Sequence, residues 1–387
     1  MRSDAHNFSG NTTQSDAIAV ARVICILGVV YVHAWTGLSG HELELARGTA
    51  QENLRWILMD VFGRSAVPLL GLISGWLVAG SRRTLDWREH IARKARTIVL
   101  PMLLWNVIAL VLVCGTAWLF TLQAPTPPSL WWIVEEIFIL TRNPDVNVQM
   151  PFLRDLFVCM VMAPVLVRTP GWTLAAVVAI AAAGQVLGFG APLILRPSIL
   201  MFFALGIAAR RLGMAERVAN WPLPLTVLPF AALMTVQLWL TLSGNEPRAN
   251  SGLATLDLLG RAAATVCFWR ISWMLARSRV RSVLLRVEPY MFLLFCSHLV
   301  LIWLGGPLLG RLTGPLGSKD YPAFLLLQPM LVLAVVIAFG AVLQWAAPGW
   351  ARVLSGGRLT SQRRLRMPAR KVLPESALTG LPEKRIV

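Results

Sequence analysis

The sequence predicts an all-α integral membrane protein with about ten transmembrane helices around a polar central path. Of its 387 residues, 56% are hydrophobic and only 14% are charged, whereas soluble domains average about 25% charged residues. Its apolar stretches also have the length of membrane spans. The expected spans cover residues 17–38, 57–79, 98–122, 151–168, 172–189, 197–209, 222–243, 253–276, 287–306 and 322–347.

The spans organise the chain into three parts. Residues 1–15 are expected to form an N-terminal tail, residues 16–348 the membrane domain, and residues 349–387 a basic, mobile tail. The basic segment before the third span predicts a surface helix at the membrane interface. Residues 123–150 predict a short helix on the opposite face.

The basic residues predict the orientation of the chain. With the loops numbered alternately, the side of both termini holds 24 lysines and arginines and the other side 7. The positive-inside rule therefore places both termini in the cytoplasm. It also accounts for the net charge of +17, so we expect a lipid bilayer and no nucleic acid as partner.

The five cysteines lie in apolar segments, without the spacing of a metal site or a redox motif. We expect them to be small packing residues, with no metal site and no disulfide.

The first span carries two side chains that a bilayer disfavours, Arg22 and His33. Burial of an ionisable group in hydrocarbon costs on the order of 3 kcal/mol, so such a residue suggests function. A spacing of eleven residues places the two on one helix face, about 16 Å apart along the axis. They predict an axial polar path.

Further charges lie toward the outer half of the membrane. Two pairs, Asp60 with Arg64 and Asp257 with Arg261, have the i,i+4 spacing of ion pairs on one helix face. Together with Arg154, Asp155, Arg196 and His298 they suggest a polar vestibule that opens outward. The alternative is that each pair only neutralises itself and joins helices.

Five motifs resemble one family. They are Arg22-x10-His33, FGRSAVPLLGLISGWL at 62–77, RKARTIVLPMLLW at 93–105, FLRDL at 152–156 and FLLFCSHLVLI at 292–302. In this order and spacing they are similar to the membrane acyltransferase family 3, in particular its fucose 4-O-acetylase-like branch. Pro151 departs from the family, which often has Trp there, and so do Cys296 and Ser297 before the late histidine.

The resemblance implies an O-acyltransferase of the bacterial inner (cytoplasmic) membrane. Such an enzyme moves an acyl group, usually acetyl from acetyl-CoA, to a hydroxyl of a surface glycan or its lipid-linked precursor. Polysaccharide-assembly proteins are possible partners.

The candidate residues fit this chemistry. His33 has the side chain suited to act as general base near neutral pH, and Arg64 and Ser74 are candidate donors to the oxyanion. Arg22, Arg93, Lys94 and Arg96 are candidate ligands for the phosphates of CoA, although cytoplasmic loops are basic in any case. Candidate acceptor-binding residues are Arg154, Asp155 and His298; a core histidine with a purely structural role is the alternative for His298.

Two other function classes stay open: a polytopic glycan or lipid transporter, and a non-catalytic partner of a polysaccharide synthase. An acyl-transfer assay with purified protein separates them from the enzyme.

Overall fold

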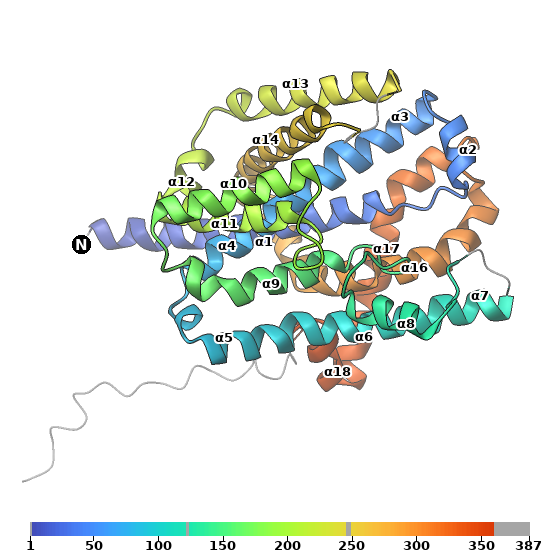
Figure 1. The fold of residues 1–387 in the computed structure, drawn as a ribbon, viewed down its shortest axis with the longest axis horizontal. Helices are drawn as coiled ribbons and strands as arrows, with labels where there is room; N and C mark the ends of the chain where they lie inside the picture. Colours follow the sequence, from blue (N-terminus) through green and yellow to red (C-terminus); the bar gives the residue numbers. More distant parts are fainter. Residues whose placement is uncertain (1, 121–123, 245–248, 360–387) are drawn as a thin grey trace, which may run out of the picture.

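The computed structural model describes residues 2–120, 124–244 and 249–359, and within them the chain folds into helices without a β-sheet (Figure 1). The longer helices are α1 (Arg2–Val32), α4 (Ser65–Ala79), α6 (Leu100–Ala109), α9 (Pro151–Leu166), α10 (Gly171–Leu187), α11 (Pro197–Arg211), α13 (Leu223–Leu242), α14 (Ser251–Ala276), α16 (Met291–Thr313) and α17 (Tyr321–Ala346).

Shorter helical elements connect or extend these helices. The α-helical ones are α2 (Gly40–Leu45), α3 (Ala50–Trp56), α5 (Trp87–Lys94), α7 (Gly115–Phe120), α8 (Leu130–Phe138), α12 (Met214–Ala219), α15 (Arg281–Val287) and α18 (Pro348–Leu354). Three π-helical segments are η1 (Ile57–Arg64), η3 (Ala95–Val99) and η4 (Leu110–Cys114), and two 3₁₀ turns are η2 (Arg82–Leu85) and η5 (Glu288–Tyr290).

Every predicted span falls largely on one of these helices or on a continuous run of helical elements, and residues 121 and 122 of the third span lie outside the described residues. The count of ten spans is not confirmed. Six helical stretches of the described residues are long and apolar enough to cross a membrane: Thr13–Val32, Ala50–Ala79, Trp87–Phe120, Leu223–Leu242, Arg281–Thr313 and Tyr321–Ala346. Helices α9, α10 and α11 have only 15 to 17 residues, and α14 carries several charged side chains.

Two expectations about element boundaries are wrong. Helix α1 ends at Val32, not at residue 38. The basic segment does not form a separate surface helix, because α5 continues through η3 into α6 as part of one helical stretch from Trp87 to Phe120. The short helix expected within 123–150 is present as α8, which packs beside α6.

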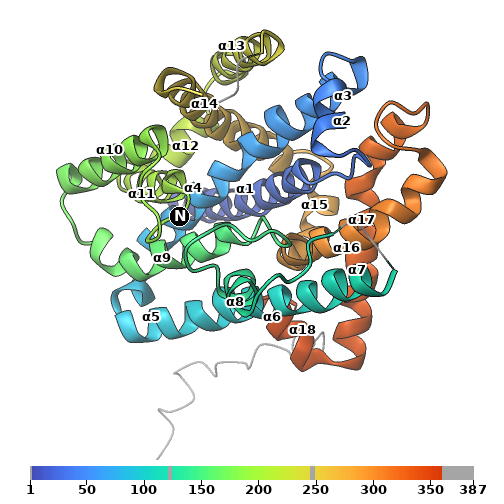
Figure 2. The same cartoon turned by 45° about the vertical axis from the view of Figure 1, so that its right-hand side comes forward.

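Helix α1 lies at the centre of the molecule, surrounded by α4, α14, α16 and α17 (Figure 2). Two glycines, Gly28 of α1 and Gly63 of the second span, let the two backbones approach closely. A Cβ on Gly63 would lie 2.5 Å from the Gly28 carbonyl oxygen, so only glycine permits this backbone approach. Gly63 lies in the π-helical segment that precedes Pro68, and proline cannot donate the helical hydrogen bond to the Arg64 carbonyl.

The described C-terminal residues fold back onto the third span. The Trp105 Nε1 donates to the Leu354 carbonyl at 3.1 Å, and Ser355 and Leu359 are buried. Gly356, with a φ of 60°, packs against the Thr97 carbonyl, which a Cβ would clash with. The expectation of a mobile chain from residue 350 is therefore wrong for residues 350–359.

Candidate active site

His33 lies in the turn directly after α1. Its backbone N–H donates to the Val30 carbonyl at 3.2 Å, which closes that turn. Two residues later, the backbone N–H of Trp35 donates to the Gln328 Oε1 at 3.1 Å, and the Tyr321 hydroxyl donates to the Trp35 carbonyl at 3.1 Å. Helix α17 thus fixes the backbone that carries His33.

The His33 imidazole faces that of His298 on α16. Their ring centroids are 5.4 Å apart, with an angle of 37° between the planes. The His298 Nδ1 lies 2.9 Å from the Phe295 carbonyl oxygen and 3.1 Å from that of Leu294. Because carbonyl oxygens only accept, Nδ1 carries the proton of the neutral ring.

This assignment leaves the His298 Nε2 as an acceptor. The residue is fully buried, and Nε2 has no hydrogen-bond partner among the described residues. A buried acceptor without a partner is uncommon in native structures and is typical of functional sites. The structure therefore brings together two of the predicted residues, His33 and His298.

Two arginines add positive charge near this pair. The charges of Arg64 and Arg196 both act on the His33 ring. Arg64 remains partly exposed, and its Nη1 donates to the Asp60 Oδ1 at 3.0 Å. Arg64 therefore lies near the histidine pair, and so does Arg196, which was expected only as part of the vestibule.

Arg196 is held in place by Asp155. This fully buried carboxylate accepts from the Arg196 N–H at 2.7 Å and the Leu195 N–H at 3.2 Å. The Arg196 Nη2 also donates to the Val148 carbonyl at 2.9 Å.

Arg154 also binds the loop of residues 192–196, which carries Arg196. Its Nη1 donates to the Asp155 Oδ1 at 2.8 Å and to the Leu193 carbonyl at 2.7 Å, and its Nη2 donates to the carbonyls of Pro192 and Leu140. Arg154 and Asp155 were predicted to bind the acceptor. The structure shows them bound to the loop of residues 192–196, and their role in acceptor binding stays a prediction.

Ser74 does not join the His33 group. Its hydroxyl donates to the Leu70 carbonyl of its own helix at 2.8 Å. It lies ten residues beyond Arg64, which corresponds to about 15 Å along the axis. Since α4 runs antiparallel to α1 from the Gly28–Gly63 contact, the eleven residues from Gly63 to Ser74 bring Ser74 to about the level of Ala17, beyond Arg22.

A second polar group lies at the other end of this stretch of α1. The Arg22 Nη1 donates to the Glu288 Oε1 at 3.0 Å. The charges of Arg22, Arg93 and Arg358 act on Lys94, so the structure gathers three of the four predicted donor-binding residues. Arg96 is exposed, and no described contact joins it to them.

The sequence prediction missed Glu288 and Arg358. In the sequence, Glu288 is marked only by being an acidic residue in an otherwise basic stretch. Arg358 is marked only by the two glycines that precede it.

The two polar groups lie at opposite ends of two neighbouring helical stretches. His33 follows Arg22 by eleven residues, in the turn after α1, and their partners Glu288 and His298 are ten residues apart on the stretch formed by η5 and α16. The two stretches therefore run parallel, with one polar pair at each end. The helical rise puts the two ends about 16 Å apart along the axis.

The outer charges expected as ion pairs are paired. Arg261 Nε donates to the Asp257 Oδ2 at 2.9 Å, and the charges of Arg64, Arg261 and Asp257 act on Asp60. The two pairs thus lie near one another, between the second span and α14.

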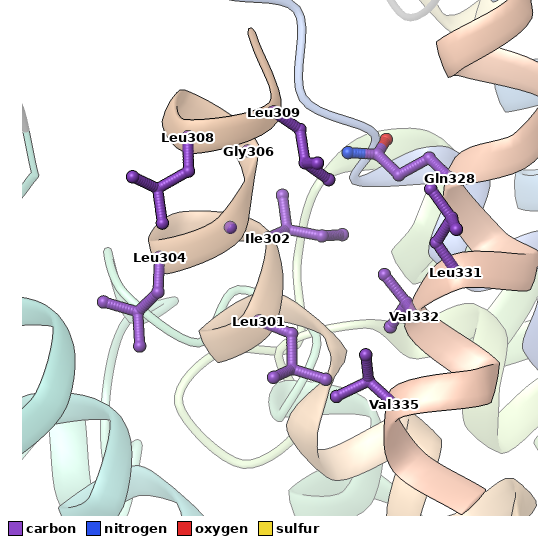
Figure 3. Close-up of a pocket in the computed structure, with 11 residues that line it drawn as sticks. Leu301, Ile302, Leu304, Gly306, Leu308, Leu309, Gln328, Leu331, Val332 and Val335 are labelled. Carbon is purple, nitrogen blue, oxygen red and sulfur yellow. The ribbon is translucent and has the colours of Figure 1, made fainter. Parts of the chain in front are cut away.

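An apolar pocket of about 280 Å³ lies between α16 and α17 (Figure 3). Gln328, which also accepts from Trp35, is the one side chain of its lining with polar atoms; the others include Leu301, Leu304, Leu331 and Val335. The pocket suits an apolar chain, and neither His33 nor His298 is among its lining residues. Within the described part of the chain, no group of three or more His, Cys, Asp or Glu side chains could hold a metal ion.

Comparison with known proteins gives two matches. Residues 15–345 match the family model described as an acyltransferase domain, that of acyltransferase family 3. The chain is also 30% identical over 398 aligned residues to the succinoglycan biosynthesis protein ExoH of Rhizobium meliloti (strain 1021), covering 96% of this chain and 99% of that protein. No solved structure matches the chain with significance.

Proposed function

Since the chain belongs to acyltransferase family 3, we propose that it moves an acetyl group from cytoplasmic acetyl-CoA to a hydroxyl of an extracytoplasmic or lipid-linked glycan. The observation that carries the proposal is the pairing along α1, with two histidines at one end and a cationic group at the other. The glycan acceptor is supported by the name of the relative, a protein of succinoglycan biosynthesis.

His33 acts as general base in this proposal. It takes the proton from the acceptor hydroxyl while that oxygen forms a bond to the thioester carbonyl carbon. When the tetrahedral intermediate collapses, the carbon–sulfur bond breaks and the proton passes from His33 to the leaving thiolate. His298 positions the His33 ring, against which its own ring packs, and its Nε2 is available as an acceptor.

Arg64 supplies the positive charge that stabilises the oxyanion, because it lies close enough to act on His33 and is partly exposed. Arg196 adds to that charge. Arg154 and Asp155 contribute to acceptor binding indirectly, by holding the loop that carries Arg196. Ser74 lies about one turn beyond the level of Arg22, too far from His33 to act on the reacting carbonyl.

The donor binds at the other end of the path. Arg22, Arg93, Lys94 and Arg96 provide charge-assisted contacts for its phosphates at the cytoplasmic surface. The separation of about 16 Å between Arg22 and His33 covers half of a hydrocarbon core near 30 Å. The pantetheine arm therefore reaches inward to His33, and CoA itself does not cross the membrane.

The test is transfer of radiolabelled acetyl from acetyl-CoA to a glycan acceptor by the purified protein. We expect His33→Ala to lower the rate at least a hundredfold, since a general base contributes about 10²–10⁴-fold. The variant should keep the elution volume and the thermal unfolding midpoint of the wild type.

The same assay tests the two alternative functions. A transporter or a non-catalytic partner of a polysaccharide synthase would transfer no acetyl group even as the wild type. Activity of His33→Ala within tenfold of the wild type would reject His33 as the base.

A further inference from the structure

Three cations from distant parts of the sequence meet at the Arg22 end of the path. Arg22 belongs to α1, Lys94 ends α5, and Arg358 follows α18. The charges of Arg22 and Arg358 both act on Lys94, and that of Arg22 acts on Arg358.

Arg358 is fixed in this position by its own segment. Its guanidinium lies over the Phe292 ring, 4.0 Å from the centroid. Its Nη1 donates to the Ser355 carbonyl at 3.4 Å, and the next residue, Leu359, donates to the Ser355 Oγ at 2.9 Å. A cation held over an aromatic face keeps its N–H edges available for another partner.

The charges of this cluster do not balance. Glu288 is the carboxylate of the group, and it pairs with Arg22 at 3.0 Å. Among the described residues, neither Lys94 nor Arg358 has a carboxylate within 4.0 Å. Desolvation by the surrounding protein and, next, the charge of Arg22 lower the pKa of Arg358 to about 10, so Arg358 remains protonated at pH 7. Like charges held together in this way favour a bound anion.

We propose that Arg358 is a phosphate ligand of the donor site, which it completes together with Arg22 and Lys94. The ligand class is a nucleotide thioester, recognised through the phosphates of its nucleotide. This inference rests on the proposed function for the identity of the donor. It adds a residue from the segment after α18 and gives that segment a role in donor binding.

The headgroup phosphate of an anionic lipid has the same chemistry. We favour the nucleotide because Arg22 extends the cationic cluster toward His33 along α1, which is the route that a thioester arm needs. The experiment includes an arm for each source.

The first measurement is calorimetric binding of adenosine 3′,5′-bisphosphate to the purified full chain. We expect Arg358→Ala to weaken binding about tenfold or more, as loss of one charge-assisted contact does, and Arg358→Lys to restore part of it. The matched control is Arg352→Ala, an exposed arginine of α18, which should bind as the wild type does. If Arg358→Ala does not fold, Arg358→Gln takes its place.

The second measurement compares two donors, acetyl-CoA and acetyl-pantetheine, which lacks the nucleotide. Arg358→Ala should raise the KM for acetyl-CoA about tenfold and leave that for acetyl-pantetheine unchanged. An equal loss with both donors, or unchanged binding of the bisphosphate, overturns the inference. If nanodiscs rich in phosphatidylglycerol abolish bisphosphate binding to the wild type, the site belongs to lipid and the inference also fails.

The design separates this inference from the proposed function. If the protein binds the bisphosphate through Arg358 but transfers no acetyl group, the phosphate site is supported and the proposed function is rejected. If the protein transfers acetyl and Arg358→Ala leaves the KM for acetyl-CoA unchanged, the proposed function is supported and the phosphate site is rejected.

Discussion

The imidazole of His33, just beyond the end of α1, and that of His298, in the first half of α16, have ring centroids 5.4 Å apart. One residue sits in a turn and the other in a regular helix, so the pair is only as rigid as the packing between α1, α16 and α17. The expected effects of substitution follow from the contacts that hold this packing.

We expect His298→Ala to lower kcat at least tenfold with little change in the KM for the donor. The reason is that His298 acts on the orientation of His33 and lies far from the donor phosphates. His298→Gln, whose amide can present an acceptor near the position of Nε2, should recover part of kcat. A loss of kcat that is equal in both variants, with an unchanged pH–rate profile, would contradict a positioning role for Nε2.

Gly63→Ala should disturb the site without touching a polar group. The added Cβ would meet the Gly28 carbonyl, and overpacking of this kind costs about 1–3 kcal/mol. We expect a lower thermal unfolding midpoint in detergent and a lower kcat, because α1 shifts relative to Arg64. Gly115→Ala is the control: a Cβ there meets nothing within 4 Å. If both variants behave like the wild type, the glycine contact does not set the geometry of the site.

Asp155→Asn should act through Arg196. The substitution removes the buried charge that accepts from Arg154 and from the Arg196 backbone, at a cost of about 2 kcal/mol or more. We expect a lower unfolding midpoint and a higher KM for the acceptor, with the KM for the donor unchanged. A rise in the donor KM alone would contradict this assignment.

The orientation of the chain is tested by labelling of single cysteines in a variant that lacks the five native ones, all of which are buried. We expect His41→Cys to react with an impermeant maleimide added to intact cells, because the residue is exposed in α2 beyond the His33 end. Arg352→Cys should react only after lysis. The reverse pattern would place the donor site on the wrong side of the membrane.

The sequence predicts the helices well because the length of each apolar stretch can be read directly from it. It fails at residues 33–38, which continue the apolar pattern of α1. The helix stops there for tertiary reasons: the Trp35 N–H donates to Gln328, almost 300 residues away, and Gly37 takes a φ of 69°. No local signal encodes that partner.

Part of the candidate site could be predicted from local sequence, and part could not. Arg22 and His33 stand out because charge is rare in an apolar helix. Arg358 does not stand out, because it is one of many basic residues in the C-terminal segment. Its position depends on the contact of Trp105 with Leu354, which joins parts of the chain that no local pattern connects.

The return of residues 348–359 to the third span has a consequence for biogenesis. A ribosome makes these residues after every membrane helix of the domain, so the fold must wait for them before Leu354 can meet Trp105 and Arg358 can reach Phe292. On the proposed role of Arg358, the donor site would therefore stay incomplete while the helices are still being inserted.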